Sequence, residues 1–430
     1  MLKKRTKTNE ISRFISFALL MATTLLVASI TPAYAYDVVV PGDLDGDLMV
    51  DDDELDTAEQ SYDDGDISAE EFEKIEHIHE NYPRTIVDTE GREVTFYKPV
   101  ERVITRAPDN CRLVVALGSG DKIVASEQSV KSCLCPTNWG IFDQGCVECY
   151  NSIMGGRMPD LPETSTRYEI DYEEMASLYP DVIFTSSVTN AEEFENKVGC
   201  PCVVAGGTGW IYDDEGLYGQ ISVVGNVLEK EDEAEELIGF IQSKINMITS
   251  VTDSLDESEK PTVYFAPRGA TKGFYDPKEG RDFTRTVTDY APINLAGGIN
   301  VADGSEGTTI NVALEQIIAW DPDYIVVSCS NPDDRGAVDF VLTSEDLQSI
   351  KAVQNGDVYN CFYPYCRGNP PDRSLFNMVY MAKLFHPDEF QDLDLEKEGN
   401  EIFEAFLGVE GAFTEYADYL VWPREYLNSQ

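Results

Sequence analysis

The sequence predicts an α/β protein with two parallel-sheet lobes, one long rigid connecting helix and a small α-helical calcium-loop module at the N-terminus. Three observations predict this arrangement. A long amphipathic helical pattern occupies residues 229–256. Short apolar segments alternate with helical segments on both sides of it, which is typical of parallel sheets covered by helices. An acidic segment ahead of both lobes has the residue spacing of a calcium-binding loop.

The N-terminus has the order of a secretory signal. Basic residues precede an apolar run from Phe14 to Ile30, and Ala33-Tyr34-Ala35 follows, so we expect cleavage after Ala35. An uncleaved anchor is the alternative, because the run is at the short end for spanning a bilayer. We therefore expect an exported protein on the extracellular or periplasmic face of the cytoplasmic membrane, soluble or anchored at its N-terminus. The predicted parts are a signal peptide at 1–35, an acidic module with a linker helix at 36–83, an N-terminal lobe at 84–228, the connecting helix at 229–256 and a C-terminal lobe at 257–430.

The charge of the chain limits its partners. With 79 acidic and 32 basic residues, the formal net charge is −47. Nucleic acids and anionic membrane surfaces are polyanions, and a protein of this charge would be repelled by them. The charge fits a strongly solvated surface outside the cell.

Residues 43–54 match the register of a twelve-residue calcium loop. Calcium requires roughly six to eight oxygen ligands, and this spacing wraps them around one point. Leu48 stands at the sixth loop position, where glycine normally makes the sharp turn. The segment resembles the calcium loops of EF-hands and dockerins, and an acidic linker without bound metal is the alternative. The candidate calcium ligands are the side chains of Asp43, Asp45, Asp47, Asp51 and Glu54 and the backbone carbonyl of Met49.

A second loop of this kind at residues 60–71 is degenerate. Gln60 and Tyr62 occupy its first and third ligand positions, so we expect a turn between helices without a metal. A helix follows from Glu70 to Asn81 and ends before Pro83.

The connecting helix is expected from Glu229 to Leu255. Its apolar residues recur every three or four positions and therefore share one face. At about 1.5 Å per residue, roughly 27 residues span about 40 Å, which suits a strut between two lobes. A plain crossover helix inside one large sheet is the alternative. The apolar positions are Ala234, Leu237, Ile238, Ile241, Ile245, Ile248, Val251 and Leu255.

Both lobes show the same alternation of strands and helices, and a hairpin signal at Glu90-Gly91 opens the first. Each half also contains a helix that ends at Pro-Asp before a buried strand, at Pro180 and at Pro322. The N-terminal lobe is predicted to have strands at 85–88, 93–96, 102–105, 122–125, 181–184 and 202–205 and helices at 109–117 and 172–177. The C-terminal lobe is predicted to have strands at 261–266, 323–327 and 357–359 and helices at 311–319, 347–352 and 374–385.

Several phrases, in the right order, resemble the substrate-binding proteins of ABC importers for iron–siderophore and cobalamin. They include the helix–Pro-Asp–strand phrase of each half, residues 221–226 before the connecting helix, residues 294–302 and residues 351–359. The resemblance covers roughly residues 84–390. It implies two α/β lobes bridged by one rigid helix, a ligand held in the cleft between them and a membrane permease as partner.

Ligands of parallel sheets bind at the carboxyl ends of the strands, which indicates residues 105–110 in the first lobe and 267–269, 328–331 and 362–373 in the second. Arginine forks suit carboxylate or phosphate oxygens, and aromatic rings suit stacking on a macrocycle. For each arginine, pairing with a neighbouring carboxylate is the alternative, and for most aromatic residues it is packing in the core or at the rim. Arg373 is expected to be structural. The candidate ligand-binding residues are Arg106, Asn110, Trp139, Trp210, Arg268, Tyr363, Tyr365 and Arg367.

The chain has three histidines, too few for a site that captures a bare transition metal, so a pre-formed metal chelate fits better. Ten cysteines are present, and four of them, Cys133, Cys135, Cys146 and Cys149, form a C-x-C and a C-x-x-C pair within one loop. Two local disulfides suit an exported protein, and a zinc or iron–sulfur site is the alternative. Further candidate disulfides join Cys200 with Cys202 and Cys361 with Cys366.

The leading functional hypothesis is a solute-binding protein, without enzymatic activity, that captures a ferric siderophore-like or corrinoid chelate and delivers it to an ABC permease. The sequence contains no nucleophile elbow, P-loop or zinc-protease motif. A calcium-dependent adaptor that binds a cell-surface scaffold through the calcium module is the second hypothesis. Redox chemistry at the cysteine loop is the third.

Overall fold

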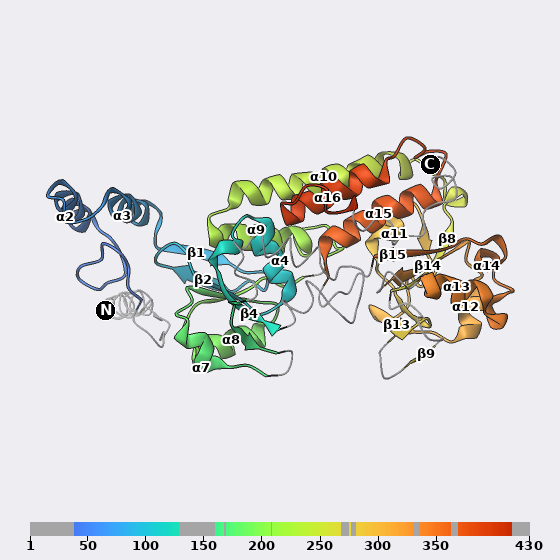
Figure 1. Ribbon diagram of the computed structural model, residues 1–430, viewed down its shortest axis with the longest axis horizontal. Coiled ribbons are helices and arrows are strands. Elements are labelled where there is room, and N and C mark those ends of the chain that lie inside the picture. The colour runs from blue at the N-terminus through green and yellow to red at the C-terminus, as the bar shows by residue number, and fades with distance from the viewer. Residues whose placement is uncertain are drawn as a thin grey trace, which may run out of the picture.

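The computed structural model describes residues 38–128, 160–166, 169–207, 209–267, 275–276, 281–329, 335–362 and 369–414 (Figure 1). Two sheet-containing lobes lie below opposite ends of one long helix, α10, as the sequence predicts (Figure 1). The N-terminal module projects from the end of the first lobe that faces away from the second (Figure 1).

The first sheet has five parallel strands in the order β5-β4-β3-β6-β7. Its central strands are completely buried apolar runs, which is expected where helices cover both faces of a parallel sheet. The strands are β3 (Val103–Thr105), β4 (Ile123–Glu127), β5 (Glu163–Ser165), β6 (Val182–Thr185) and β7 (Cys202–Val204). The helices are α4 (Pro108–Ala116), α7 (Tyr172–Ser177), α8 (Val188–Lys197) and α9 (Leu217–Leu228), with a 3-10 turn η1 at Gly120–Lys122.

The predicted hairpin ahead of this sheet is confirmed. Strand β1 (Arg84–Val87) pairs antiparallel with β2 (Glu93–Phe96). Gly91 supplies the left-handed backbone of the turn, with φ of 76°.

The second sheet has four strands in the order β12-β8-β14-β15, again all parallel. They are β8 (Thr262–Ala266), β12 (Ile299–Asn300), β14 (Tyr324–Cys329) and β15 (Val358–Phe362). Two short antiparallel pairs accompany them, β9 (Tyr275–Asp276) with β10 (Arg281–Asp282) and β11 (Arg285–Val287) with β13 (Thr309–Asn311). The helices are α11 (Ala291–Leu295), α12 (Leu314–Trp320), α13 (Arg335–Thr343), α14 (Lys351–Asn355), α15 (Pro371–Phe385) and α16 (Leu395–Leu407), with 3-10 turns η3 (Glu257–Glu259) and η4 (Glu345–Leu347).

The connecting helix α10 runs from Glu231 to Thr252, so its 22 residues span about 33 Å. It begins two residues later than expected, because Glu229 takes a left-handed conformation that ends α9, and it ends three residues earlier, at Thr252. Four of the predicted apolar positions are buried, and Lys244 is buried with them. Helices α15 and α16 lie alongside α10 (Figure 1).

Two expected helices of the second lobe begin later than the sequence indicates. Residues 309–311 form strand β13, which pairs with β11, and α12 begins only at Leu314. The helix expected at 347–352 is a 3-10 turn followed by α14, which begins at Lys351. For α12, pairing with β11 overrides the helical pattern of the sequence. For α14, the extended backbone of Ile350 delays the start of the helix.

The N-terminal module consists of α2 (Asp52–Asp63) and α3 (Ala69–Asn81), each opened by a capping box. Ile75 and Ile78 of α3 are buried in the same apolar cluster as the first lobe. Two polar contacts join α3 to that lobe, Lys74 to Glu101 at 2.5 Å and His77 to Glu229 at 2.7 Å. The module is therefore seated on the first lobe.

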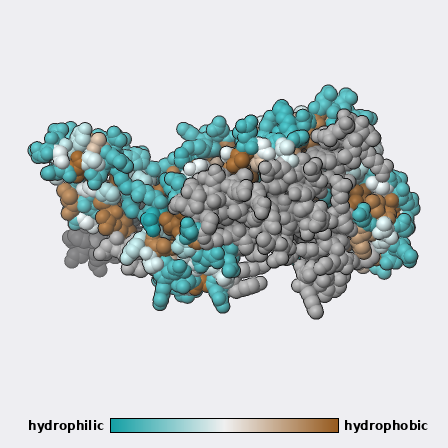
Figure 2. Space-filling view, in the orientation of Figure 1, coloured by the Kyte–Doolittle hydropathy of each residue, from teal (hydrophilic) through white to brown (hydrophobic). Residues whose placement is uncertain are grey.

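The helices among the described residues are too short or too polar to cross a membrane. Hydrophilic residues cover most of the coloured surface along the upper side of the molecule, over α10 and the outer helices (Figure 2). This agrees with the excess of acidic residues in the sequence.

Candidate functional site

The first wall of the candidate site is the carboxyl edge of the first sheet. Arg106 follows directly after β3, and its backbone N–H donates to the carbonyl of Phe184 in β6 at 2.8 Å. Asn110, in the first turn of α4, is completely buried, and its Nδ2 donates to the carbonyl of Ala205 at the end of β7 at 2.8 Å. Both predicted residues therefore lie where the strands β3, β6 and β7 end.

Several buried polar atoms at this edge have no hydrogen-bond partner. They are Nε of Arg106, Oδ1 of Asn110, and the hydroxyls of Ser126 in β4 and Thr185 in β6. A buried polar group without a partner costs free energy, so such a group marks a place where a ligand or water completes the hydrogen bonding. Four groups of this kind on neighbouring elements make this edge the best candidate for a polar ligand.

In the second lobe, Asn377 of α15 holds the end of β15, another strand end where the sequence predicts ligand-binding residues. Its Oδ1 accepts from the N–H of Phe362 at 3.0 Å, and its Nδ2 donates to the carbonyl of Phe362 and to the hydroxyl of Tyr290, both at 2.9 Å. Ser328, near the end of β14, donates its hydroxyl hydrogen bond to the carbonyl of Pro267. These contacts fix the strand ends from which the predicted second-lobe ligand loops begin.

Trp210 does not lie at an open surface. Only 4% of it is exposed, and its ring packs edge-on against Tyr290 with 5.3 Å between ring centroids. Because Trp210 belongs to the segment before α9 and Tyr290 to the second lobe, the pair is a contact between lobes. The structure thus assigns this side chain to packing, which was the alternative interpretation. Trp139, Arg268, Tyr363, Tyr365 and Arg367 lie outside the described residues.

The loop at residues 43–54, predicted to bind calcium, brings three of its candidate ligands together. Carboxylate oxygens of Asp43, Asp45 and Asp47 all lie within 4.8 Å of one another. Leu48 adopts φ of 71°, the left-handed conformation for which glycine is normally used at this position.

The other predicted calcium ligands have different contacts in this structure. Asp51 caps α2 by accepting from the N–H of Glu54 at 2.9 Å. Glu54 accepts from the N–H groups of Leu44 at 2.6 Å and Asp45 at 3.2 Å, and Met49 is exposed. The turn at Leu48 therefore has the left-handed conformation that a calcium loop needs at its sixth position, and three of the six predicted ligands lie close together.

The structure contradicts the disulfide predicted between Cys200 and Cys202, because both thiols are free and buried. Cys361 is also buried, and Cys366 lies outside the described residues, so the bond between them stays a prediction. Residues two apart in an extended strand share one face, and their Cα atoms lie about 6.6 Å apart, at the upper end of the range that a disulfide spans. Burial raises the pKa of Cys200 and Cys202, so these thiols stay protonated. Cys133, Cys135, Cys146 and Cys149 lie outside the described residues.

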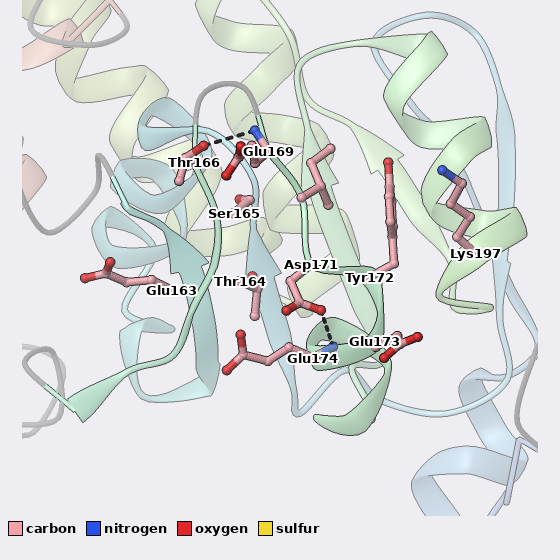
Figure 3. Close-up of a pocket in the computed structure, with 11 residues that line it drawn as sticks. Glu163, Thr164, Ser165, Thr166, Glu169, Asp171, Tyr172, Glu173, Glu174 and Lys197 are labelled. Carbon is pink, nitrogen blue, oxygen red and sulfur yellow. Dashed lines mark hydrogen bonds between the residues drawn. The ribbon is translucent and has the colours of Figure 1, made fainter.

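Sequence reasoning missed an acidic groove of about 650 Å³ along the edge strand β5 (Figure 3). Asp171 accepts from the N–H of Glu174 at 2.9 Å and so opens α7 at one side of the groove. The ammonium of Lys197 lies 4.2 Å from the ring centroid of Tyr172 at the other side. Five carboxylates line the groove, those of Glu163, Glu169, Asp171, Glu173 and Glu174, and this charge disfavours an anionic ligand.

A family model described as periplasmic binding protein matches residues 103–363, more than half of the chain. Among curated relatives, the molybdate-binding protein MolA of Haemophilus influenzae is 24% identical over 344 residues, covering 75% of this chain and 90% of the relative. The vitamin B12-binding protein of Vibrio parahaemolyticus is 25% identical over 295 residues, covering 67% of this chain and 90% of the relative.

Solved structures show the same fold. MolA of Haemophilus influenzae bound to molybdate matches with a TM-score of 0.59 at 21% identity, covering 76% of this chain and 98% of that one. The TroA-like periplasmic binding protein FepB from Veillonella parvula also matches with a TM-score of 0.59, at 19% identity, covering 76% of this chain and 97% of that one.

Proposed function

The chain belongs to the periplasmic binding protein family, and from this premise we propose that it captures a metal chelate, a ferric siderophore or a corrinoid, between its lobes and delivers it to an ABC permease. The observation that carries the proposal is the set of unpartnered polar atoms at the carboxyl edge of the first sheet, on Arg106, Asn110, Ser126 and Thr185. The ends of parallel strands are where such folds bind their ligands.

The chemistry of this edge favours a ligand with oxygen acceptors. Arg106 supplies a guanidinium N–H, and Ser126 and Thr185 supply hydroxyls that can donate. The net charge of the chain is −47, so a buried cationic donor is needed to hold an anionic ligand against the overall repulsion. Anionic chelates present carboxylate, hydroxamate or phosphate oxygens and meet this requirement. A metal oxyanion such as molybdate, which one relative is named for binding, presents the same acceptors and is the competing ligand.

The test is a calorimetric titration of the mature chain with ferric siderophores, cyanocobalamin and sodium molybdate, supported by tryptophan fluorescence. We expect saturable binding of one ligand class at micromolar concentration or tighter. The double variant Ser126→Ala/Thr185→Val should weaken that binding, because it removes two of the donors at little change in volume. If molybdate alone binds, the ligand is an oxyanion and the proposed chelate is wrong. If none of these ligands binds, the result contradicts the proposed function.

Delivery requires a partner in the membrane, and we propose that the protein works on the outer face of the cytoplasmic membrane. The predicted secretory signal at residues 1–35 supports export. Two further curated relatives are named as substrate-binding lipoproteins of ABC transporters in Bacillus subtilis.

A calcium-dependent adaptor is the second candidate function. The convergence of Asp43, Asp45 and Asp47 within one loop, with Leu48 in a left-handed conformation, supports a calcium-binding module. A protein partner that is retained on the immobilised chain with calcium and released by a chelator would favour the adaptor. The two functions are compatible, because the module lies outside the two lobes (Figure 1).

A further inference from the structure

The lobes are joined by a hydrogen bond at the start of two helices. Both carboxylate oxygens of Asp109, the second residue of α4, accept from the backbone N–H of Asn369, at 2.9 and 3.0 Å. Asn369 lies two residues ahead of α15 in the second lobe. This contact therefore ties the first lobe to the second at a point outside α10.

The Asp109 carboxylate is itself held in place by Arg112. Nη1 of Arg112 donates to Oδ1 of Asp109 at 2.7 Å, and only 5% of Arg112 is exposed. A charge-assisted bond from a buried guanidinium orients the carboxylate, so Asp109 presents its oxygens to Asn369 in one position.

The opposite side of the Asn369 backbone is fixed by close packing. A Cβ atom at Gly209 would lie 1.9 Å from the carbonyl oxygen of Asn369, so only glycine permits this approach. The next residue is Trp210, whose ring packs against Tyr290 of the second lobe. Residues 109 and 209 of the first lobe thus hold the Asn369 backbone, and Trp210 contacts the second lobe at Tyr290.

We propose that Asp109 is a positioning residue, which sets the separation of the two lobes through its hydrogen bond to Asn369 and so determines the width of the ligand cleft. Rotation of the lobes about the axis of α10 is restricted by attachment points outside that helix, and the contact between Asp109 and Asn369 is one of them. The effect of Asp109 on ligand binding rests on the proposed function, whereas its effect on the separation of the lobes is independent of that function.

The first experiment removes the donor and leaves Asp109 and Arg112 intact. Asn369→Pro eliminates the N–H, and Pro370 already biases residue 369 toward extended backbone, the region in which proline is accommodated. Asn369→Ala keeps the N–H and is the matched control. Each variant is also made with Trp210→Phe, so that the difference between the two spectra isolates the Trp210 emission.

In the ligand-free protein, we expect Asn369→Pro to shift the Trp210 emission to longer wavelength and to raise its acrylamide quenching constant at least twofold. Asn369→Ala should match the wild type. Equal quenching in the two variants would overturn the proposal.

The second experiment weakens the acceptor and guards against misfolding of the first variant. Asp109→Asn replaces the charge-assisted bond by a neutral one, so hydrogen exchange at the Asn369 amide should become about tenfold faster. Asp232→Asn, an exposed site on α10, removes the same charge and should leave that exchange rate unchanged. An unchanged rate in Asp109→Asn would overturn the proposal.

Cyanocobalamin and sodium molybdate are then titrated into the same proteins. For a probe that binds the wild type, Asn369→Pro should lower the affinity about tenfold or more, with Asn369→Ala unaffected. Equal affinities would overturn the role of Asp109 in ligand binding. Failure of these two probes and of the ferric siderophores to bind counts against the proposed function, and the ligand-free measurements then decide the positioning role on their own.

Discussion

Lys244, in the middle of the connecting helix, donates to the carboxylate of Glu398 in α16 at 2.6 Å, with only 9% of each side chain exposed. Glu401 accepts from the same ammonium. Helix α16 contacts α4 of the first lobe and α15 of the second, so this ion pair ties the connecting helix to an element that reaches both lobes. Burial lowers the pKa of Lys244, but the hydrogen bonds and charges of Glu398 and Glu401 outweigh it and hold the pKa above its ordinary value of 10.5.

Replacing Lys244 alone should strongly destabilise the protein. Lys244→Met leaves the Glu398 carboxylate buried without its partner, and breaking a buried pair in this way costs about 3 kcal/mol. The double variant Lys244→Met/Glu398→Met replaces both charges by apolar groups and should recover most of that loss. Urea unfolding followed by circular dichroism measures the free energy of unfolding of the single and the double variant. A double variant as unstable as the single one would show that the ion pair itself, rather than an unpaired charge, determines the stability.

The same cluster gives a prediction for acidic pH. The hydrogen bond from Lys244 is the main cause that lowers the pKa of Glu401 below its ordinary value of 4.5. A lowered pKa in the folded state means that the stabilisation is present above pH 4.5 and is lost as the pH falls through the folded-state pKa.

Urea midpoints of the wild type and Lys244→Met, measured from pH 7 to pH 3, should therefore converge at the acidic end. The contribution of Glu401 is at most about 1 kcal/mol, because 40% of its side chain is exposed. Carboxylates that do not contact Lys244 titrate equally in both proteins and cancel in the comparison. Midpoints that diverge as the pH falls would contradict the assignment.

The architecture could be read from the sequence because its signals are local. The apolar period of residues 231–252, the Glu90-Gly91 turn and the buried strand after Pro180 each depend on neighbouring residues, and each is found in the structure. Helix α12 shows where this reasoning fails. Its expected first residue, Asn311, pairs instead with Arg285 of β11, a partner 26 positions earlier in the chain that no local pattern reveals.

The candidate site was predictable only in part for the same reason. Arg106 and Asn110 follow from the rule that ligands bind at strand ends, and the structure places both there. The sequence could not show that Trp210 would be covered by Tyr290, because this contact joins residues 80 positions apart. Nor could it distinguish Asp109 or Asp88 among 79 acidic residues, although Asp88 is a buried acceptor for Val204 and Arg92.

The calcium prediction is tested by titrating the mature chain with calcium in chelator-treated buffer. We expect one site per chain, because the second loop lacks carboxylates at its first and third positions. Asp45→Asn should weaken binding at least tenfold, since it removes one of three converging carboxylates. Asp66→Asn in the second loop removes the same charge and should have little effect. Equal losses in the two variants would indicate diffuse attraction by the acidic module in place of a defined site.

The role of Arg106 in ligand capture can be separated from its charge. Arg106→Gln removes a guanidinium whose Nε is buried without a partner, whereas Lys122→Gln removes the same charge at the amino end of β4, away from the carboxyl edge of the sheet. A hydrogen bond to a charged group contributes about 2 kcal/mol, so Arg106→Gln should weaken binding of the identified ligand roughly thirtyfold. Lys122→Gln should change it less than about threefold, and this small change should vanish at high salt, since exposed charges are screened. Calorimetry at low and high ionic strength makes the comparison. If both variants lose the same affinity and both losses disappear at high salt, Arg106 contributes only its charge. The hydroxyls of Ser126 and Thr185 would then be the specific contacts to the ligand.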